Sequence, residues 1–161
     1  MDETQPITDA PADSADERWM REALALAREA ESKDEVPVGA ILVRGGVILG
    51  RGFNQPIASC DPTAHAEIQA VREAAAAIGN YRLEGTTLYS TLEPCVMCAG
   101  ALVHARITRL VFGARDLRFG GVRSKFQLAD SDILNHRIEI IEGVLAADCM
   151  ELLERFFRSR R

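Results

Sequence analysis

Two short segments constrain the fold of this chain most, because they carry residue types that ligate metal ions. They are His65-Ala66-Glu67 and Pro94-Cys95-Val96-Met97-Cys98. Imidazole and thiolate are ordinary zinc ligands, and a catalytic zinc site has three protein ligands and keeps the fourth position for water. We therefore predict that the fold brings His65, Cys95 and Cys98 onto one zinc ion, in an open site suited to hydrolytic chemistry.

The spacing of these residues indicates how such a site is built. Pro62 and Pro94 each lie where proline is favoured in the first turn of a helix, so the ligands are predicted near two helix N-termini. The positive end of a helix lowers the pKa of a thiol, which favours the thiolates that zinc requires. Cys95 and Cys98 are three residues apart and therefore share one face of a helix.

Glu67 is predicted to be a proton carrier and not a ligand. It follows His65 by two residues, and in the interior of a helix such a pair does not face the same way. The difficulty disappears if the site lies over the open end of the helix, where side chains of the first turn can lean toward a common point. Glu67 then takes a proton from water and passes it to the leaving group, as general acid-base catalysis requires.

Length and composition bound the class of protein. A chain of 161 residues with 47% apolar content is sufficient for one domain with a real core. The sequence contains no apolar run of about 18 residues and no secretory signal, so no membrane partner is expected. Its four cysteines are too few for a disulfide framework. We expect a cytoplasmic protein in a reducing compartment.

The charge of the chain is unevenly distributed. The net charge is -5, but only acidic residues precede Arg18, so the remainder is about neutral. Residues 1–15 are polar and are predicted to be a disordered acidic leader, and residues 16–161 to form the domain. All but two of the 19 cations are arginine, which suits phosphate and base contacts. The arginines at positions 155, 158, 160 and 161 fit either that role or a solvated helix end stabilised by cations.

Hydrophobic periodicity predicts an α/β domain. The predicted elements are a helix over 16–33, hairpin strands over 38–43 and 47–53, a loop over 54–60, a helix over 62–78, a strand over 87–91, a helix over 95–105, strands over 109–113 and 138–141, and a helix over 146–161. Strand-helix-strand units imply a parallel portion of the sheet. The prediction is a three-layer α/β/α fold whose mixed sheet of about five strands starts with an antiparallel hairpin.

The two metal-ligand segments and several further blocks resemble the tRNA-specific adenosine deaminase family, within the cytidine deaminase-like superfamily of zinc deaminases. Its motif is H-x-E followed by P-C-x-x-C. The other matching blocks lie at residues 35–40, 52–54, 61–64, 99–101, 111–116 and 156–161. The resemblance implies a cytidine deaminase-like fold, one zinc ion per subunit, a homodimer, and hydrolytic deamination of adenosine to inosine at the wobble position of a tRNA anticodon stem-loop.

The resemblance also implies roles for individual residues. Zinc would be held by His65, Cys95 and Cys98, and Glu67 would shuttle protons. The remaining implied roles are base binding by Asn54 in a pocket edged by Val36 and Pro37, steadying of the attacking oxygen by the backbone N–H of Ala66, and contacts of Arg115, Asp116, Phe157 and Arg158 with neighbouring nucleotides.

One segment departs from the family pattern. Members often have a small loop like Lys-Thr-Gly-Ala after the Ala-Arg-Asp block, whereas residues 117–124 here are bulkier and more basic. The contacts of residues 117–132 are therefore open, and Arg118 and Arg123 fit either phosphate contacts or a solvated loop. Phe156 and Phe157 have the spacing of a helix face, so core packing is expected for at least one of them.

Two other functions remain open at this point. A deaminase of free bases or nucleotides, of the guanine or cytosine type, would share the zinc motif without needing the terminal cations. A non-catalytic zinc module that binds nucleic acid would need a fourth protein ligand such as Cys60.

Overall fold

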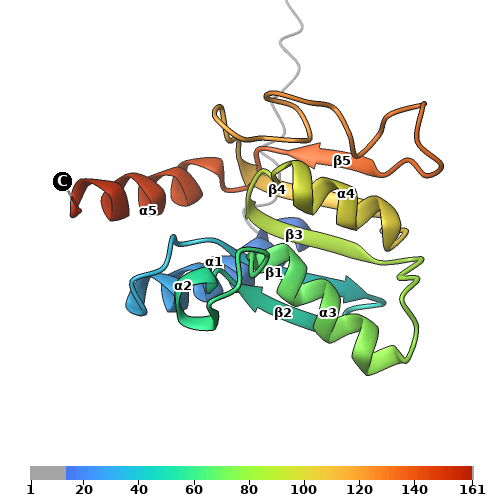
Figure 1. Ribbon diagram of the computed structural model, residues 1–161, viewed down its shortest axis with the longest axis horizontal. Helices are drawn as coiled ribbons and strands as arrows, with labels where there is room; N and C mark the ends of the chain where they lie inside the picture. Colours follow the sequence, from blue (N-terminus) through green and yellow to red (C-terminus); the bar gives the residue numbers. More distant parts are fainter. Residues whose placement is uncertain (1–13, 161) are drawn as a thin grey trace, which may run out of the picture.

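A computed structural model describes residues 14–160 and shows one mixed sheet between two layers of helices (Figure 1). The elements in chain order are α1 (Ala15–Ser32), β1 (Gly39–Arg44), β2 (Val47–Phe53), α2 (Pro56–Ser59), α3 (Ala66–Ile78), β3 (Thr87–Leu92), α4 (Val96–His104), β4 (Arg109–Ala114), β5 (Glu139–Glu142) and α5 (Ala146–Arg158). No helix of the described part of the chain has the length and apolarity that a membrane span needs.

The sheet has the strand order β2-β1-β3-β4-β5 and begins with the predicted antiparallel hairpin. Gly45 and Gly46 both have positive φ, which is what the short turn between β1 and β2 requires. Strand β1 pairs antiparallel with β3, and β3, β4 and β5 are parallel. These observations confirm the predicted mixed sheet of five strands.

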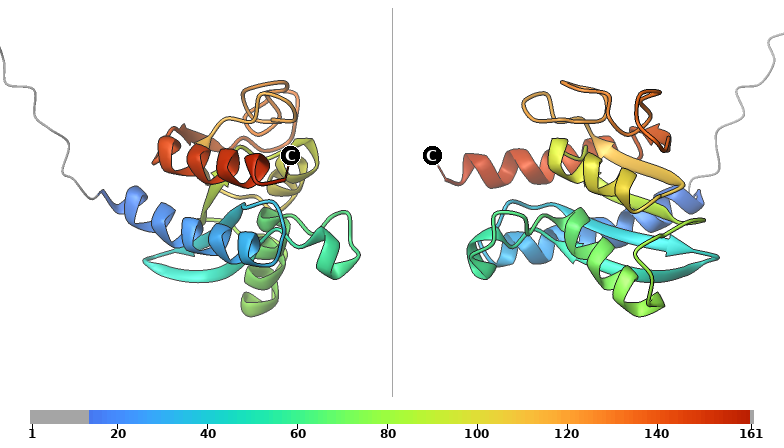
Figure 2. Two further views of the ribbon diagram at one scale, coloured as in Figure 1. Left: turned by 90° about the vertical axis from the view of Figure 1, so that its left-hand side faces the viewer. Right: turned by 45° about the vertical axis from the view of Figure 1, so that its right-hand side comes forward.

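Two apolar clusters lie on opposite faces of the sheet and complete the predicted three layers. Helices α1 and α5 cover one face, and Figure 2 shows them running side by side. Helices α3 and α4 cover the other face. Trp19 of α1 packs against the cluster beneath α1 and α5. Phe112 of β4 is among the largest fully buried residues of the cluster beneath α3 and α4.

Helix α3 lies unusually close to the hairpin, and this approach positions the site described below. A Cβ at Gly50 or Gly52 of β2 would overlap the backbone of α3 at Ala70 or Ala66. The small residues Ala66, Ala70 and Ala74 recur every four positions and are fully buried along this contact. The glycine and alanine faces therefore fix α3, and with it the residues at its N-terminus, against the sheet.

The structure corrects three details of the predicted elements. Residues 54–60, predicted as a loop, contain the short helix α2. The helix predicted from residue 62 begins at Ala66, because the Asp61 carboxylate accepts the N–H and hydroxyl of Thr63 in a local turn. Helix α1 begins at Ala15, where the leader was predicted to continue, while residues 1–13 and Arg161 lie outside the described part.

Candidate active site

The three predicted metal ligands lie at the N-termini of two helices. His65 is the N-cap of α3, Cys95 is the N-cap of α4, and Cys98 lies in the first turn of α4. The prediction about helix ends is thus correct, but its stated cause is wrong. Pro62 lies in the turn before α3 and Pro94 precedes the N-cap of α4, so neither proline occupies the first helical turn.

The ligand atoms of these residues converge. His65 Nδ1 lies 3.6 Å from Cys95 Sγ and 3.5 Å from Cys98 Sγ, and all three ligand atoms lie within 4.8 Å of one another. One nitrogen and two sulfurs at this separation suit a tetrahedral zinc ion with one further position. Within residues 14–160, no fourth histidine, cysteine or carboxylate joins this group. Cys60 is exposed in the αL region next to α2 and contacts Ile57 O at 3.8 Å, so it does not close the site.

The mutual contacts of these ligands shift their proton affinities. A hydrogen bond from Cys98, assisted by His65, lowers the pKa of the Cys95 thiol to about 4. The same contact with Cys95, together with burial, raises the pKa of Cys98. Contact with Cys95 also raises the pKa of His65. A divalent cation held by these residues would take the place of the shared protons, because zinc ligands must be deprotonated.

Glu67 lines the same pocket as His65 and Cys95, although it is only two residues from His65. The backbone of His65 is extended, with φ -78° and ψ 153°, so the rule for pairs inside a helix does not apply to it. The Glu67 side chain is 3% exposed, and this burial raises the pKa of its carboxyl group. A carboxyl group beside a metal site with a raised pKa is well suited to both accepting and donating a proton.

A pocket of about 460 Å³ opens over this cluster. It is lined by Val36, Val38, Asn54, Pro56, His65, Glu67, Leu92, Glu93, Cys95, Asp116 and Phe119. Val36 lines the pocket as predicted from the resemblance, whereas Pro37 is not among the lining residues. Sequence reasoning missed Glu93 and Phe119 as pocket residues. Glu93 could have been suspected because it is a carboxylate two positions before a ligand.

Asn54 is held in the pocket by the backbone of α3. Its Oδ1 accepts the N–H of Ala66 at 2.8 Å, which leaves the amide NH2 group as the donor that Asn54 can offer to a ligand in the pocket. In this structure the N–H of Ala66 is therefore engaged with Asn54. The proposed role of that N–H toward an attacking oxygen stays a prediction.

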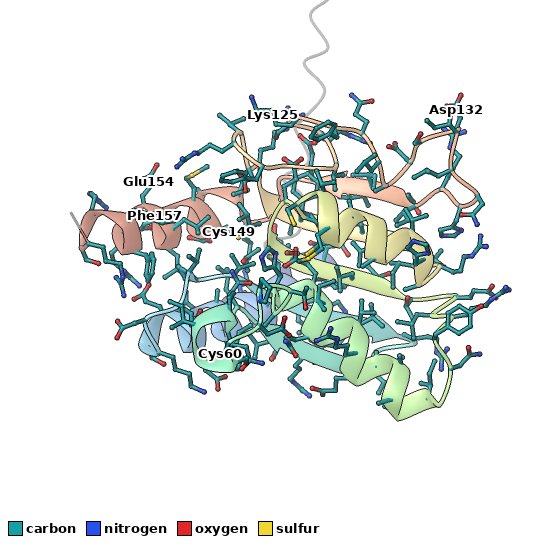
Figure 3. The ribbon with its side chains drawn as sticks, viewed as in Figure 1. Cys60, Lys125, Asp132, Cys149, Glu154 and Phe157 are labelled. Carbon is teal, nitrogen blue, oxygen red and sulfur yellow. The ribbon has the colours of Figure 1, made fainter. Side chains whose placement is uncertain are left out.

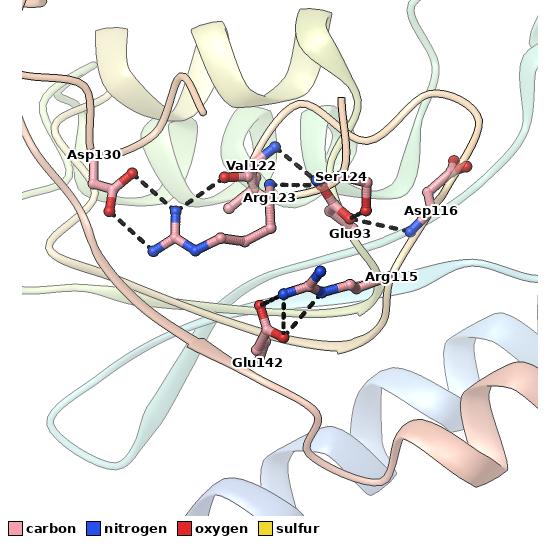
Figure 4. A network of polar contacts seen from close by, with 8 residues as sticks. All are labelled: Glu93, Arg115, Asp116, Val122, Arg123, Ser124, Asp130 and Glu142. Carbon is pink, nitrogen blue, oxygen red and sulfur yellow. Dashed lines mark hydrogen bonds and ion pairs between the residues drawn. The ribbon is translucent and has the colours of Figure 1, made fainter. Parts of the chain in front are cut away.

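The residues predicted to contact neighbouring nucleotides are not gathered in one place. Asp116 lines the pocket, but Arg115 forms an ion pair with Glu142 of β5 at 2.9 Å (Figure 4). Phe157 lies on α5, is 52% exposed, and does not line the pocket (Figure 3). Arg158 is also exposed on α5. Phe156 is buried, in agreement with the expectation that one of the two phenylalanines packs in the core.

The C-terminal arginines divide into two groups. Arg155 of α5 contacts Glu31 of α1 at 3.0 Å, and Arg160, just after α5, contacts Asp34, just after α1, at 2.8 Å. The Arg160 guanidinium also lies over the Phe156 ring, 3.5 Å from its centroid. At least half of the C-terminal cations therefore have a structural partner, and within the described residues Arg158 is the one that remains for an anionic ligand.

Comparison with known proteins agrees with this geometry. Residues 13–114 match the family model of the cytidine and deoxycytidylate deaminase zinc-binding region. The tRNA-specific adenosine deaminase of Haemophilus influenzae is 53% identical over 147 residues, which are 91% of this chain and 85% of that protein. The chain belongs to the zinc-binding deaminase family of the tRNA-specific adenosine deaminases. The enzyme of the same name from Bacillus subtilis is 45% identical and covers 91% of each chain.

Solved structures show the same relationship. A structure from work on A-to-I editing by tRNA:A34 deaminases at the wobble position superposes with a TM-score of 0.82 and 42% identity, over 84% of this chain and 99% of that one. The guanine deaminase of Nitrosomonas europaea has a TM-score of 0.78 at 24% identity, over 92% of this chain and 88% of that one, and shares the fold. These comparisons confirm the cytidine deaminase-like fold and zinc as the expected metal.

Proposed function

We propose that this protein hydrolytically deaminates adenosine to inosine at the wobble position of a tRNA anticodon. One observation carries the proposal: the buried carboxylate of Glu67 lines a pocket with His65 and Cys95, which converge with Cys98 on a metal site that no fourth ligand among the described residues closes. Relatives that are 45–53% identical are named tRNA-specific adenosine deaminases, which supports the choice of substrate.

In the proposed reaction His65, Cys95 and Cys98 would hold one zinc ion per subunit. When bound, this ion supplies the Lewis acidity that makes water a nucleophile near neutral pH. Glu67 accepts a proton from the attacking water and delivers it to N1 of the adenine as the water oxygen bonds to C6. It then accepts the remaining proton of that oxygen and donates it to the amine, so that the C6–N bond breaks, ammonia leaves and a C6 carbonyl remains. Its burial keeps the carboxyl close to the substrate and away from bulk water.

The other pocket residues bind and orient the base. The NH2 group of Asn54 donates to an acceptor on the base, because Oδ1 is already occupied by the N–H of Ala66. Val36, Val38 and Leu92 provide apolar walls for the ring. An anticodon base is already unpaired in a loop, so placing it in this pocket costs less than extruding a base from a duplex.

We further propose a cytoplasmic homodimer. Ile57 of α2 is 74% exposed and Val96 and Met97 of α4 are 45% and 37% exposed, which is apolar surface suited to burial against a second copy. A cytoplasmic site agrees with the exposed free thiol of Cys60 and with a tRNA substrate. Sedimentation velocity of Met97→Glu compared with wild type tests the dimer, since a charge at a dimer contact shifts the protein toward the monomer.

The deciding assay offers the purified protein an arginine tRNA anticodon stem-loop, free adenosine, free cytidine and free guanine. We expect inosine to form only in the stem-loop. Glu67→Ala should retain zinc and its folded state but lose at least a hundredfold in rate, as general acid-base groups contribute about 10²–10⁴-fold. Glu73→Ala, on the exposed side of the same helix, is the matched control and should keep full activity.

Other outcomes assign other functions. Turnover of free guanine or cytidine without action on the stem-loop would support a deaminase of free bases or nucleosides. Zinc binding together with RNA binding but without any deamination would support a non-catalytic module.

A further inference from the structure

One buried side chain organises the long connection between β4 and β5, which departs from the family pattern. Glu93 is 2% exposed, and its carboxylate accepts the backbone N–H groups of Asp116 at 3.1 Å, Val122 at 3.1 Å, Arg123 at 2.8 Å and Ser124 at 2.9 Å, as well as the Ser124 hydroxyl (Figure 4). Residues 116–124, which we name the Glu93 wall, thus fold around a single carboxylate and form one side of the pocket.

A pair of glycines lets this wall approach the metal ligands. A Cβ at Gly120 would overlap the Glu93 carboxylate and lie 2.6 Å from Asp116 O, and a Cβ at Gly121 would lie 2.8 Å from the backbone nitrogen of Val96. Gly120 forms a bridge with Cys95, and the N–H of Gly121 donates to Pro94 O at 2.8 Å. The wall is therefore docked on the segment that carries two of the ligands.

Phe119 is the aromatic residue that this wall presents at the pocket. Its side chain lines the pocket and yet is 63% exposed, so it lies at the mouth and not at the base. Its backbone N–H donates to Asp116 Oδ1 at 3.1 Å, and the guanidinium of Arg118 lies 5.5 Å from the ring centroid. A large apolar ring is thus held beside the entrance by a backbone that is hydrogen-bonded on both sides of it.

We propose that Phe119 stacks on the nucleobase adjacent to the target adenosine and so selects a base within a polynucleotide over a free nucleoside. This inference rests on the proposed function. A base that reaches Glu67 and the ligands lies below the rim, so the rim ring meets what flanks that base. Aromatic rings bind bases by stacking without reading their hydrogen-bonding edges, and a nearby arginine adds attraction for the phosphates. Because the backbone around Phe119 is already ordered, stacking requires little further loss of conformational freedom.

The test measures coupling between Phe119 and the flanking base. Wild type and Phe119→Ala are assayed on an intact anticodon stem-loop and on two versions that carry an abasic site on the 5′ or the 3′ side of the target. We expect wild type to lose about tenfold in kcat/KM, mainly through KM, on one abasic version, which corresponds to the stacking of one base. Phe119→Ala should show that loss already on the intact stem-loop and no further loss on the abasic one.

Two variants complete the design. Phe126→Ala removes a ring of similar exposure, 55%, from the same connection but away from the pocket, and should behave as wild type. Phe119→Trp should retain the affinity for the intact stem-loop because it keeps a stacking face. Equal losses for wild type and Phe119→Ala on both abasic versions would overturn the role of Phe119 while leaving the proposed function intact. A wild-type protein that does not deaminate the intact stem-loop would overturn both.

Discussion

Two parts of the pocket lining are held by two buried carboxylates in different ways. Glu35 is 2% exposed and accepts the N–H groups of Ala58 at 2.9 Å and Ile57 at 3.4 Å, which supports α2 and the adjoining residues 36–38. We name this side the Glu35 wall. Its turn also has backbone hydrogen bonds of its own, such as Ser59 N to Gln55 O at 2.9 Å.

The Glu93 wall contains no helix or strand, and its carboxylate receives five donors where Glu35 receives two. Buried backbone N–H groups need partners, and a regular element supplies most of them locally. In the Glu93 wall, the Glu93 carboxylate is the hydrogen-bond acceptor for four of the backbone N–H groups. A carboxylate therefore supplements secondary structure on one side of the pocket and replaces it on the other, so the two walls should respond differently to mutation.

Among these variants, Glu93→Ala is expected to lose the most stability and activity relative to wild type. It leaves four buried or partly buried N–H groups without their acceptor, so we expect a loss of about 3 kcal/mol in unfolding free energy, measured by urea denaturation of the zinc-loaded protein. Displacement of Asp116 and Phe119 should lower kcat/KM about a hundredfold. Glu93→Gln, which keeps one carbonyl acceptor, should be intermediate. An unchanged unfolding midpoint in Glu93→Ala would show that the wall is held by other contacts.

A somewhat smaller effect is expected when Gly120 is replaced. In Gly120→Ala the new methyl group meets a carboxylate that five donors hold in place, so overpacking should cost about 2 kcal/mol. Gly100→Ala in α4 is the matched control, because a Cβ there meets nothing within 4 Å and alanine is the better helix former. Thermal unfolding of the two variants measures the contrast, and equal melting temperatures would contradict it.

Removing Glu35 should cost less than removing Glu93. Glu35→Ala deletes a cap of a single-turn helix that keeps its backbone hydrogen bonds, so we expect a loss of about 1 kcal/mol. Hydrogen exchange should show faster exchange at Ile57 and Ala58 and unchanged protection in residues 116–124. Loss of protection in both walls would mean that they are one cooperative unit.

The smallest effect is expected for the ion pair that joins the Glu93 wall to Asp130. Arg123 contacts Asp130 at 2.9 Å, and this contact lowers the pKa of Asp130 below its ordinary value of 3.8 (Figure 4). A carboxyl with a lowered folded-state pKa stabilises the fold above its ordinary pKa, and the benefit is lost as the pH falls through the folded value. Asp130→Asn should therefore lose under about 1 kcal/mol at pH 7. Urea denaturation at pH 7 and below pH 3.8 should show this difference shrinking in acid, and a difference that grows there would contradict the assignment.

The zinc ligands and most elements follow from the sequence because their signals are local. A period of 3.6 marks α1 through Met20, Ala23, Leu24, Ala27 and Ala30, all of which are buried. The spacing of Cys95 and Cys98 predicted that their thiols lie together, and the structure places Cys95 at the N-cap and Cys98 in the first turn of α4. The α2 turn and the start of α3 at Ala66 were missed because side chains compete there with helical hydrogen bonds. The Asp61 carboxylate holds the Thr63 N–H, and Glu35 stabilises α2 from 23 residues away.

The sequence by itself determined the ligand set, the apolar faces and the order of the elements, since each depends on the spacing of neighbouring residues. Only the tertiary structure decided which residues surround the pocket. The Glu93 carboxylate accepts donors up to 31 residues along the chain, Arg155 pairs with Glu31 of α1, and Arg160 pairs with Asp34 just after α1. The packing of strands and helices determines these partners. A buried hydrogen bond requires only that its two groups lie close in the fold, so its partners have no regular spacing in the sequence.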